Sequence, residues 1–336
     1  VNSLKHLDGL QALTSLVELS IKDNGLVSIA PLVALFSLKI LHVDNNNLTD
    51  IEAVASMNQL EHLSEKIGNL TNLRSLNLHN NQLKDLPDSF AELTKLHTLH
   101  LGNNALTELP VTLSHLPNLK DLELNRNRLS TLPSATLFQN LTSLRILSNN
   151  LSTLPEDIGA YNKLETLDLS YNPITRLPNS MATLTSLKSV TLNQNGMRTI
   201  PLNLFRIPNL ETLRINYQKF TTISSALFQL QHLKTLEISG GNVLFFPEGI
   251  GALQNLNTLY LYGLRLQAIP SGIARLSKLT TLNLSRNHIR VLPPWLFDMQ
   301  NLRYLDLYEN RIPPEDIVKL QQALPKCDIR YRIIND

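Results

Sequence analysis

The chain has 336 residues, of which 43% are hydrophobic, 17% charged and only 5% aromatic, and its net charge is +2. Lys and Arg alternate with Asp and Glu without a basic tract, so the sequence gives no support for nucleic-acid binding. No apolar run reaches the length of a membrane span, and the single cysteine, Cys327, excludes an intramolecular disulfide.

A repeat of 22 or 23 residues governs the chain from its first residues. The first two copies begin at Leu16 and Leu38 with a spacing of 22 residues. Later copies begin at Leu73, Leu96, Leu119, Leu164, Leu187, Leu210, Leu233, Leu256, Leu279 and Leu302. Self-similarity at this period predicts a solenoid, here a single array of about 14 copies over residues 1–312. Because Val1 already lies inside a repeat, we expect the array to be truncated at its N-terminus.

Each copy predicts one short strand and one turn. In Leu73–Leu83 the spacing is LxxLxLxxNxL, and its centre alternates apolar and polar residues as in a half-buried strand. Asn81 stands at the turn, where its side chain can satisfy backbone groups as strand pairing ends. Equivalent residues predict a ladder of Asn24, Asn46, Asn81, Asn104, Asn127, Asn172, Asn195, Asn287 and Asn310. Leu-Pro pairs such as Leu86-Pro87 then begin an irregular or short helical return path.

The period is interrupted at two places, and the ladder at three. Near residues 63–64 about ten residues of a copy are absent, and near 147–148 we expect a copy about three residues short that lacks its strand centre. Both positions predict a break in the sheet, which we interpret as residues missing from the sequence. Gln218, Gly241 and Leu264 occupy ladder positions and predict its interruption there.

Residues 313–336 depart from the repeat. Pro313-Pro314-Glu315-Asp316 precedes apolar residues at helical spacing and predicts a Pro-initiated amphipathic helix. Residues 326–331 alternate and predict a last strand. A terminal segment of this kind covers the open end of a solenoid core, so we expect it to be a C-terminal cap.

These spacings resemble the leucine-rich repeat family. The resemblance implies an α/β fold, a curved right-handed horseshoe with a parallel β-sheet on its concave face. The first copies are similar to the internalin-like type, and the Leu-Pro copies to intracellular Ras-suppressor-like and many bacterial proteins. The cap resembles that of bacterial leucine-rich repeat proteins and implies a bacterial origin. Without disulfide-closed ends, the compartment is expected to be either the cytoplasm or a bacterial secreted or surface location.

The concave face is the candidate binding surface, because side chains there are not fixed by the core. Tyrosine and arginine, the usual anchors of protein interfaces, gather on it in the C-terminal half. The candidate partner-binding residues are Tyr171, Arg214, Tyr217, Tyr260, Tyr262, Arg286, Tyr304 and Tyr308. They predict a protein partner. A glycan is an alternative ligand, because tyrosines can stack on sugar rings, and the strand propensity of tyrosine is the alternative to binding.

The sequence has neither a convincing metal-binding pattern nor a catalytic motif. His42, His79 and His100 share the predicted sheet face, but their spacing is loose, and we expect solvated histidines and no metal site. A pH-sensitive contact remains open. Phosphate-loop, zinc-protease and nucleophile-elbow motifs are missing, so we expect neither an enzyme nor a cofactor. The sequence therefore predicts a protein-interaction module; the alternatives are a secreted effector or surface factor that recognises host protein or glycan, and the targeting domain of a larger effector enzyme.

Overall fold

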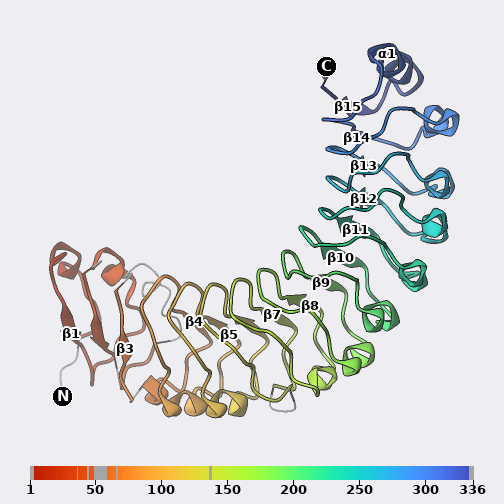
Figure 1. The fold of residues 1–336 in the computed structure, drawn as a ribbon. Coiled ribbons are helices and arrows are strands. Elements are labelled where there is room, and N and C mark those ends of the chain that lie inside the picture. Colours follow the sequence, from red (N-terminus) through yellow and green to blue (C-terminus); the bar gives the residue numbers. More distant parts are fainter. Residues whose placement is uncertain are drawn as a thin grey trace. The chain divides into compact units, whose positions relative to one another are not determined.

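The computed structural model describes residues 4–35, 37–43, 45–48, 59–65, 67–135 and 138–332. Two compact units divide the chain, Val1–Asn172 and Pro173–Asp336. In each unit a short parallel strand leads through a turn to a 3₁₀ helix, and strands and helices line opposite sides (Figure 1). The predicted solenoid of parallel strands is thus confirmed in both. In the part of the chain that the structure describes, no helix has the length and apolarity to cross a membrane.

The first unit contains eight described strands in two parallel sheets. They are β1 (Glu18–Ser20), β2 (Ile40–His42), β3 (His62–Leu63), β4 (Ser75–Asn77), β5 (Thr98–His100), β6 (Asp121–Glu123), β7 (Ser143–Arg145) and β8 (Thr166–Asp168). The 3₁₀ helices are η1 (Leu10–Ala12), η2 (Ala30–Ala34), η4 (Ile67–Asn69), η5 (Asp88–Glu92), η6 (Val111–His115) and η8 (Ile158–Ala160). The central residue of each strand from β4 to β8 is a buried leucine, in register with its neighbours.

The second unit continues the same pattern and ends in an α-helix. Its strands are β9 (Ser189–Thr191), β10 (Thr212–Ile215), β11 (Thr235–Ile238), β12 (Thr258–Tyr260), β13 (Thr281–Asn283), β14 (Tyr304–Asp306) and β15 (Asp328–Arg330). Its helices are η9 (Asn179–Thr183), η10 (Leu202–Arg206), η11 (Ser225–Gln229), η12 (Glu248–Ala252), η13 (Ser271–Arg275), η14 (Pro294–Asp298) and α1 (Pro314–Ala323). Within α1, Ile317 and Leu320 are buried, and β15 pairs with β14.

Proline determines where most 3₁₀ helices begin. At Pro87, Pro110 and Pro178 the backbone is extended, with φ near −63°. Proline fixes φ and has no N–H, so it ends the extended return segment without leaving a donor unpaired. The short helix that follows places one apolar side chain into the core, such as Phe90 of η5.

Side-chain amides form the predicted ladder along the turns. Asn127 illustrates the geometry: its Oδ1 accepts from the N–H of Leu106 at 3.0 Å, and its Nδ2 donates to the carbonyl of Leu101 at 2.9 Å. Gln218 makes the equivalent two bonds, to the Met197 N–H at 2.9 Å and the Leu192 carbonyl at 2.6 Å. The predicted interruption at Gln218 is therefore wrong, because the longer amide reaches the same partners.

The next two ladder positions, Gly241 and Leu264, have no side-chain amide. At Leu264 the backbone carbonyl takes the place of the amide oxygen and accepts from the N–H of Val243 at 2.9 Å. Asn287 then accepts from two N–H groups with one Oδ1, those of Leu264 and Leu266, both at 3.0 Å. The turn at Leu264 is thus altered, and these three N–H groups still find partners.

The copy near 147–148 is complete, contrary to expectation. It begins at Leu141, 22 residues after Leu119 and 23 before Leu164. Its strand β7 pairs with β6 and with β8, and Asn149 takes the ladder position, accepting from the N–H of Leu129 at 3.0 Å. The predicted lack of a strand centre was wrong because Ile146, not Leu147, is the inward residue that follows the strand.

Near 63–64 the structure does contain an irregular copy. The strand β3 has two residues and pairs with β2, and among the described residues it ends a three-stranded sheet, while β4 begins the next one. Leu60 serves both neighbours: it starts the segment that leads into β3, and its N–H donates to Asn81 Oδ1 at 3.1 Å. Leu60 therefore occupies both the first and the last leucine position of a shortened repeat.

Candidate functional site

A row of polar and charged side chains crosses the exposed face of the second unit. In register from β10 to β15, the third strand residues stand side by side, about 4.8 Å apart. They are Arg214, Glu237, Tyr260, Asn283, Asp306 and Arg330. We call this surface the C-terminal strand face. These side chains point away from the leucine core, and all except the buried Asp306 are exposed or half-buried and available to a partner.

A hollow of about 220 Å³ opens at the end of this row. Its lining residues are Tyr262, Asn283, Ser285, Arg286, Asp306, Tyr308 and Arg330. Asp306 is buried and accepts hydrogen bonds from the Tyr308 N–H at 2.9 Å and the Tyr304 hydroxyl at 3.3 Å. The guanidinium of Arg330 lies over the ring of Tyr308, 5.2 Å from its centroid. The hollow therefore combines an aromatic wall with cationic and anionic groups held in place.

Two tyrosines extend the aromatic part of this face. The rings of Tyr217 and Tyr262 meet edge to face, with centroids 6.3 Å apart. Burial raises the pKa of Tyr262 to about 12, and a hydrogen bond with Tyr217 acts in the same direction. Tyr217 is 57% exposed, so most of its ring remains free for contact.

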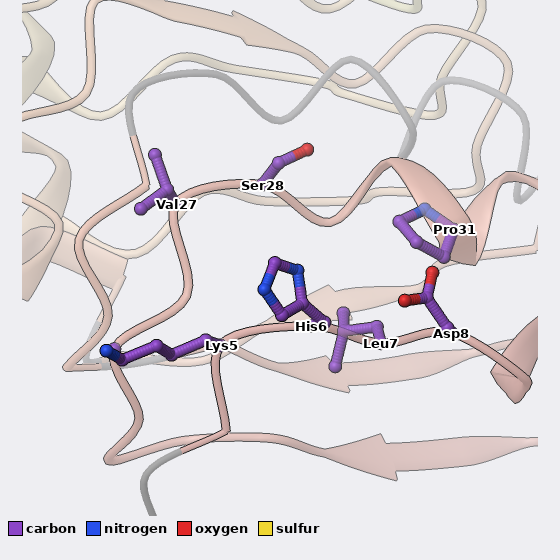
Figure 2. A pocket seen from close by; sticks show the side chains of 8 residues that line it. Lys5, His6, Leu7, Asp8, Val27, Ser28 and Pro31 are labelled. Atoms are coloured by element: carbon purple, nitrogen blue, oxygen red, sulfur yellow. The ribbon is translucent and has the colours of Figure 1, made fainter.

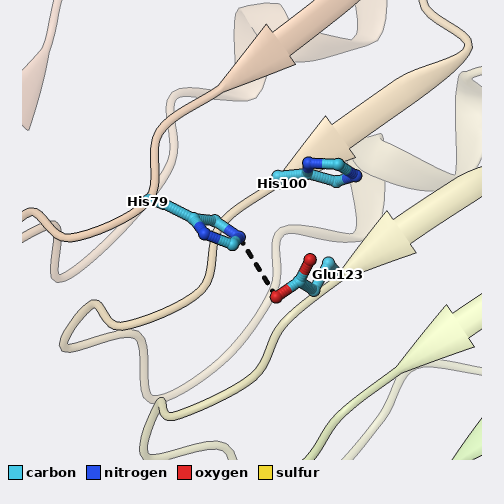
Figure 3. A group of neighbouring side chains, drawn as sticks. All are labelled: His79, His100 and Glu123. Atoms are coloured by element: carbon cyan, nitrogen blue, oxygen red, sulfur yellow. Dashed lines mark ion pairs between the residues drawn. The ribbon is translucent and has the colours of Figure 1, made fainter. Parts of the chain in front are cut away.

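A second cluster lies on the strand face of the first unit (Figure 3). His100 and Glu123 stand in register on β5 and β6, and His79 follows β4 on the same face. His79 Nε2 lies 3.2 Å from Glu123 Oε1, and the two imidazole rings are 5.5 Å apart. One ligand atom from each of the three residues lies within 4.8 Å of the others.

An ion pair borders this cluster. Arg145 contacts Asp121 at 3.0 Å, and His100 Nε2 lies 3.4 Å from the other oxygen of Asp121. Burial lowers the pKa of His79, against the attraction of Glu123. For Asp121 burial acts to raise the pKa, but His100 and Arg145 outweigh it and the pKa is lowered. The lowered pKa of Asp121 favours its ionised carboxylate, and the lowered pKa of His79 disfavours its protonation.

A second hollow, of about 450 Å³, lies near the first described residues (Figure 2). Its lining includes Lys5, His6, Leu7, Asp8, Val27 and Pro31. Figure 2 shows the side chains of Lys5 and Asp8 at opposite ends of the labelled group. Without convergence of polar groups, this hollow offers less chemical specificity than the two strand-face clusters.

Family comparison agrees with the repeat and the ladder. The sequence model described as a leucine-rich repeat region matches residues 50–152 and 221–326, and that of the leucine rich repeat matches 139–197. The first match alone covers more than half of the chain. The chain belongs to the leucine-rich repeat family. Membership of this family supports a role in protein interaction, and a search of the curated proteins finds no match.

Solved leucine-rich repeat structures resemble this protein over nearly its whole length. The protein LIC12759 of Leptospira interrogans is 29% identical, with a TM-score of 0.69, over 96% of this chain and 86% of that one. The internalin InlF of Listeria monocytogenes is 22% identical, with a TM-score of 0.53, over 100% of this chain and 85% of that one. InlJ from the same organism is 23% identical, with a TM-score of 0.64, over 95% and 63%. The two Listeria structures show the fold alone.

The leucine-rich repeat structure brings most of the predicted residues together. Tyr262, Arg286 and Tyr308 line one hollow, and Tyr260 and Tyr304 lie on the strands beside it. Two other residues take part differently: the strand residue Arg214 forms an ion pair with Glu237 at 3.2 Å, and Tyr171 belongs to the first unit. Tyr171 is 46% exposed, and with Tyr217 and Arg286 it occupies a left-handed turn position rather than a strand.

Three contributors were missed from the repeat pattern. Arg330 comes from the cap strand, which does not match the repeat; the alternation of 326–331 was the available signal for its place beside Asp306. Glu123 completes the histidine cluster, and Gly102 leaves room for it. The strand register would have placed Glu123 beside His100. The space that Gly102 leaves could not be predicted from the sequence, because it depends on the positions of the neighbouring side chains.

The environment of the single cysteine in this leucine-rich repeat protein disfavours the reactive thiolate form. Burial raises the pKa of the Cys327 thiol to about 11, and the neighbouring Asp328 adds to the effect. A thiol is a nucleophile only as the thiolate, which a raised pKa disfavours. The raised pKa therefore keeps the Cys327 thiol in its protonated, weakly nucleophilic form at neutral pH.

Proposed function

We propose that this leucine-rich repeat protein is a protein-interaction module and that its partner binds the C-terminal strand face. One observation carries the proposal: the hollow beside β13–β15 unites tyrosine rings, arginine and a buried carboxylate on one exposed surface. Such a combination provides contact area together with directional polar groups, which is typical of interface hot spots.

The charges at the hollow favour an acidic partner segment. Arg286, Arg330 and Arg332 contribute three positive charges there, whereas Asp306 and Glu309 contribute two negative ones. Asp306 is buried and already accepts three hydrogen bonds. A carboxylate of the partner would therefore find exposed guanidinium groups, which bind carboxylates in a bidentate geometry.

Preorganisation supports binding by this surface. The strands are held by continuous pairing from β9 to β15, and Arg330 is already placed against Tyr308 and Asp306. A surface whose side chains are fixed before association loses less entropy when a partner binds. Affinity would then depend on a few contacts rather than on the total area of the sheet.

A site-specific crosslinking experiment tests the proposal. A photoreactive phenylalanine analogue replaces Tyr308 in one variant and Phe245 in another; Phe245 is 67% exposed and lies in the segment between β11 and η12. We expect a protein adduct from position 308 only, with competition by excess unlabelled wild type. Equal adducts from both positions, or an adduct from Phe245 alone, would contradict binding by the strand face.

Binding measurements with the captured protein then identify the anchors. Tyr260→Ala with Tyr308→Ala should weaken binding at least tenfold, whereas the matched control Phe245→Ala should leave it unchanged. Arg214 is unsuitable for charge reversal, because Glu237 lies 3.2 Å from it and the variant would place two carboxylates together. If the double variant binds as wild type does after circular dichroism shows both folded, the proposed anchors are wrong.

The likeness to the Leptospira protein supports a bacterial origin. A secreted or surface factor is the more specific form of this proposal, and the absence of an intramolecular disulfide, with Cys327 the single cysteine, is compatible with it. Fractionation of the producing cells tests that form, since protein found only in the cytosol would contradict it. A glycan ligand would show itself as binding to a glycan array that the Tyr260→Ala, Tyr308→Ala variant loses.

A further inference from the structure

The cluster of His79, His100 and Glu123 has the composition of a transition-metal site. The three side chains come from three successive repeats and lie together on the strand face, where His79 and Glu123 point toward one another (Figure 3). Their side chains are partly buried: His79 is 26% exposed and Glu123 14%. Two imidazoles and one carboxylate are ligands that suit zinc and its neighbours, whereas calcium and magnesium prefer oxygen ligands alone.

Gly102 makes this convergence possible. It follows β5 at the position that His79 occupies after β4, so it lies between His79 and the next repeats. A Cβ on Gly102 would lie 2.8 Å from His79 Nε2 and 3.1 Å from Glu123 Oε1. The absent side chain therefore leaves a space at the point where the nitrogen and the oxygen meet.

The His79 nitrogen in this space lacks a hydrogen bond. Among the described residues, Nε2 of His79 is buried and finds no hydrogen-bond partner, although Glu123 Oε1 lies only 3.2 Å away. A buried polar atom without a partner is costly unless something else satisfies it.

The surrounding groups orient the candidate ligands. Asn125 Nδ2 donates to Glu123 Oε1 at 2.7 Å, and the Asn125 side-chain oxygen accepts from the Leu147 N–H at 2.8 Å. Asp121 lies 3.4 Å from His100 Nε2. With Nδ1 of His100 as the ligand atom, Asp121 would support the ring from the opposite nitrogen, and Asn125 already supports the carboxylate, as is usual for metal ligands.

We propose that His79, His100 and Glu123 form a binding site for a divalent transition-metal ion of the zinc class, with solvent completing its coordination. Bonds of about 2.0–2.2 Å in tetrahedral geometry place ligand atoms roughly 3.3–3.6 Å apart. The 3.2 Å between His79 and Glu123 already fits, and the 4.8 Å limit for the whole group requires only side-chain rotation. Arg145, 3.8 Å from Glu123 Oε2, opposes the cation, but Asp121 neutralises it at 3.0 Å.

Metal titration of the tag-free full chain tests the site. After treatment with a chelator, ZnCl₂ is titrated by calorimetry and CoCl₂ by visible absorption, which reports the coordination geometry. We expect one equivalent in wild type, and at least a 100-fold loss of affinity in His79→Ala and in Glu123→Gln. The matched control is His97→Ala, because His97 lies outside the three-residue cluster and its Nδ1 is 2.7 Å from the Lys95 carbonyl oxygen; the zinc affinity of this variant should stay unchanged.

Gly102→Ala tests the geometry without removing a ligand. Since its Cβ would occupy the space at His79 Nε2, we expect affinity to fall roughly 10- to 100-fold, as for other changes around metal ligands. Circular dichroism establishes whether each variant is folded. If a histidine variant unfolds, Glu123→Gln tests the site instead, because it conserves the size of the side chain. Absence of zinc binding in wild type, or unchanged affinity in folded Glu123→Gln, overturns the proposal.

Discussion

Replacement of Asn127 by alanine should destabilise the first unit through one unpaired backbone group. Asn127 is 8% exposed, and its Oδ1 is the acceptor for the N–H of Leu106, which is fully buried. The carbonyls of Leu101 and Leu124 also lose a donor, but Asn104 and Asn149 still donate to them at 3.0 and 2.9 Å. The cost therefore lies mainly in the buried Leu106 N–H, about 1–3 kcal/mol for an unpaired donor.

Asn118→Ala is the matched control. Asn118 is exposed and donates one hydrogen bond, to the Thr94 carbonyl at 2.8 Å, so its loss should change stability by less than about 0.5 kcal/mol. Urea unfolding followed by circular dichroism gives the difference, and hydrogen exchange at Leu106 localises it, since repeat arrays need not unfold in one step. If Asn127→Ala costs no more than Asn118→Ala, or Leu106 remains protected, the ladder does not stabilise the turns as argued.

Three further predictions concern glycines with positive φ, the ionisation of Tyr262 and the reactivity of Cys327. Gly241→Ala should lower the free energy of unfolding by more than about 2 kcal/mol, because φ is +89° and the Cβ would lie 2.5 Å from the Phe220 carbonyl oxygen. Gly263→Ala, at a φ of +62° in open space, should lower it by about 1–2 kcal/mol. Equal losses in urea unfolding would contradict the steric argument. Because folding raises the pKa of Tyr262 to about 12, the unfolded chain loses the hydroxyl proton at a lower pH than the folded chain, and stability should fall as pH rises above 10. Spectrophotometric titration of wild type should show a late-ionising tyrosine that Tyr262→Phe lacks. Cys327, with a pKa of about 11, should react with iodoacetamide at pH 8 much more slowly in the folded than in the urea-unfolded chain, and equal rates would show an unperturbed thiol.

The repeat itself could be predicted because each element depends on local spacing. Leucine and asparagine recur at fixed intervals, and a strand of three residues followed by a turn needs no distant information. The error at 147–148 has a local cause as well: Ile146 takes the place of leucine in the strand, so a pattern read on leucine alone begins the copy in the wrong place. Gln218 shows the same limit, since a longer amide meets a requirement that spacing assigns to asparagine.

The two clusters on the strand faces were predictable to different degrees. Residues that share a strand position stand in register, so Tyr260 and Asn283 could be placed as neighbours before any coordinates. His79 and Glu123 lie two repeats apart at different positions in their repeats, and no periodic rule brings them to 3.2 Å.

The decisive residue in the histidine cluster is the one with no side chain. A glycine at position 102 is unremarkable in a sequence, because its effect consists of the space it leaves between His79 and Glu123. In a solenoid, lateral spacing is fixed by strand pairing, so a small residue in one repeat lets side chains of its two neighbours approach across it. Small residues flanked by ligand-type residues in adjacent repeats are therefore the pattern by which such sites can be sought in other arrays. Gly102→Ala, which changes neither ligand nor charge, separates this account from one in which the two histidines alone bind a metal.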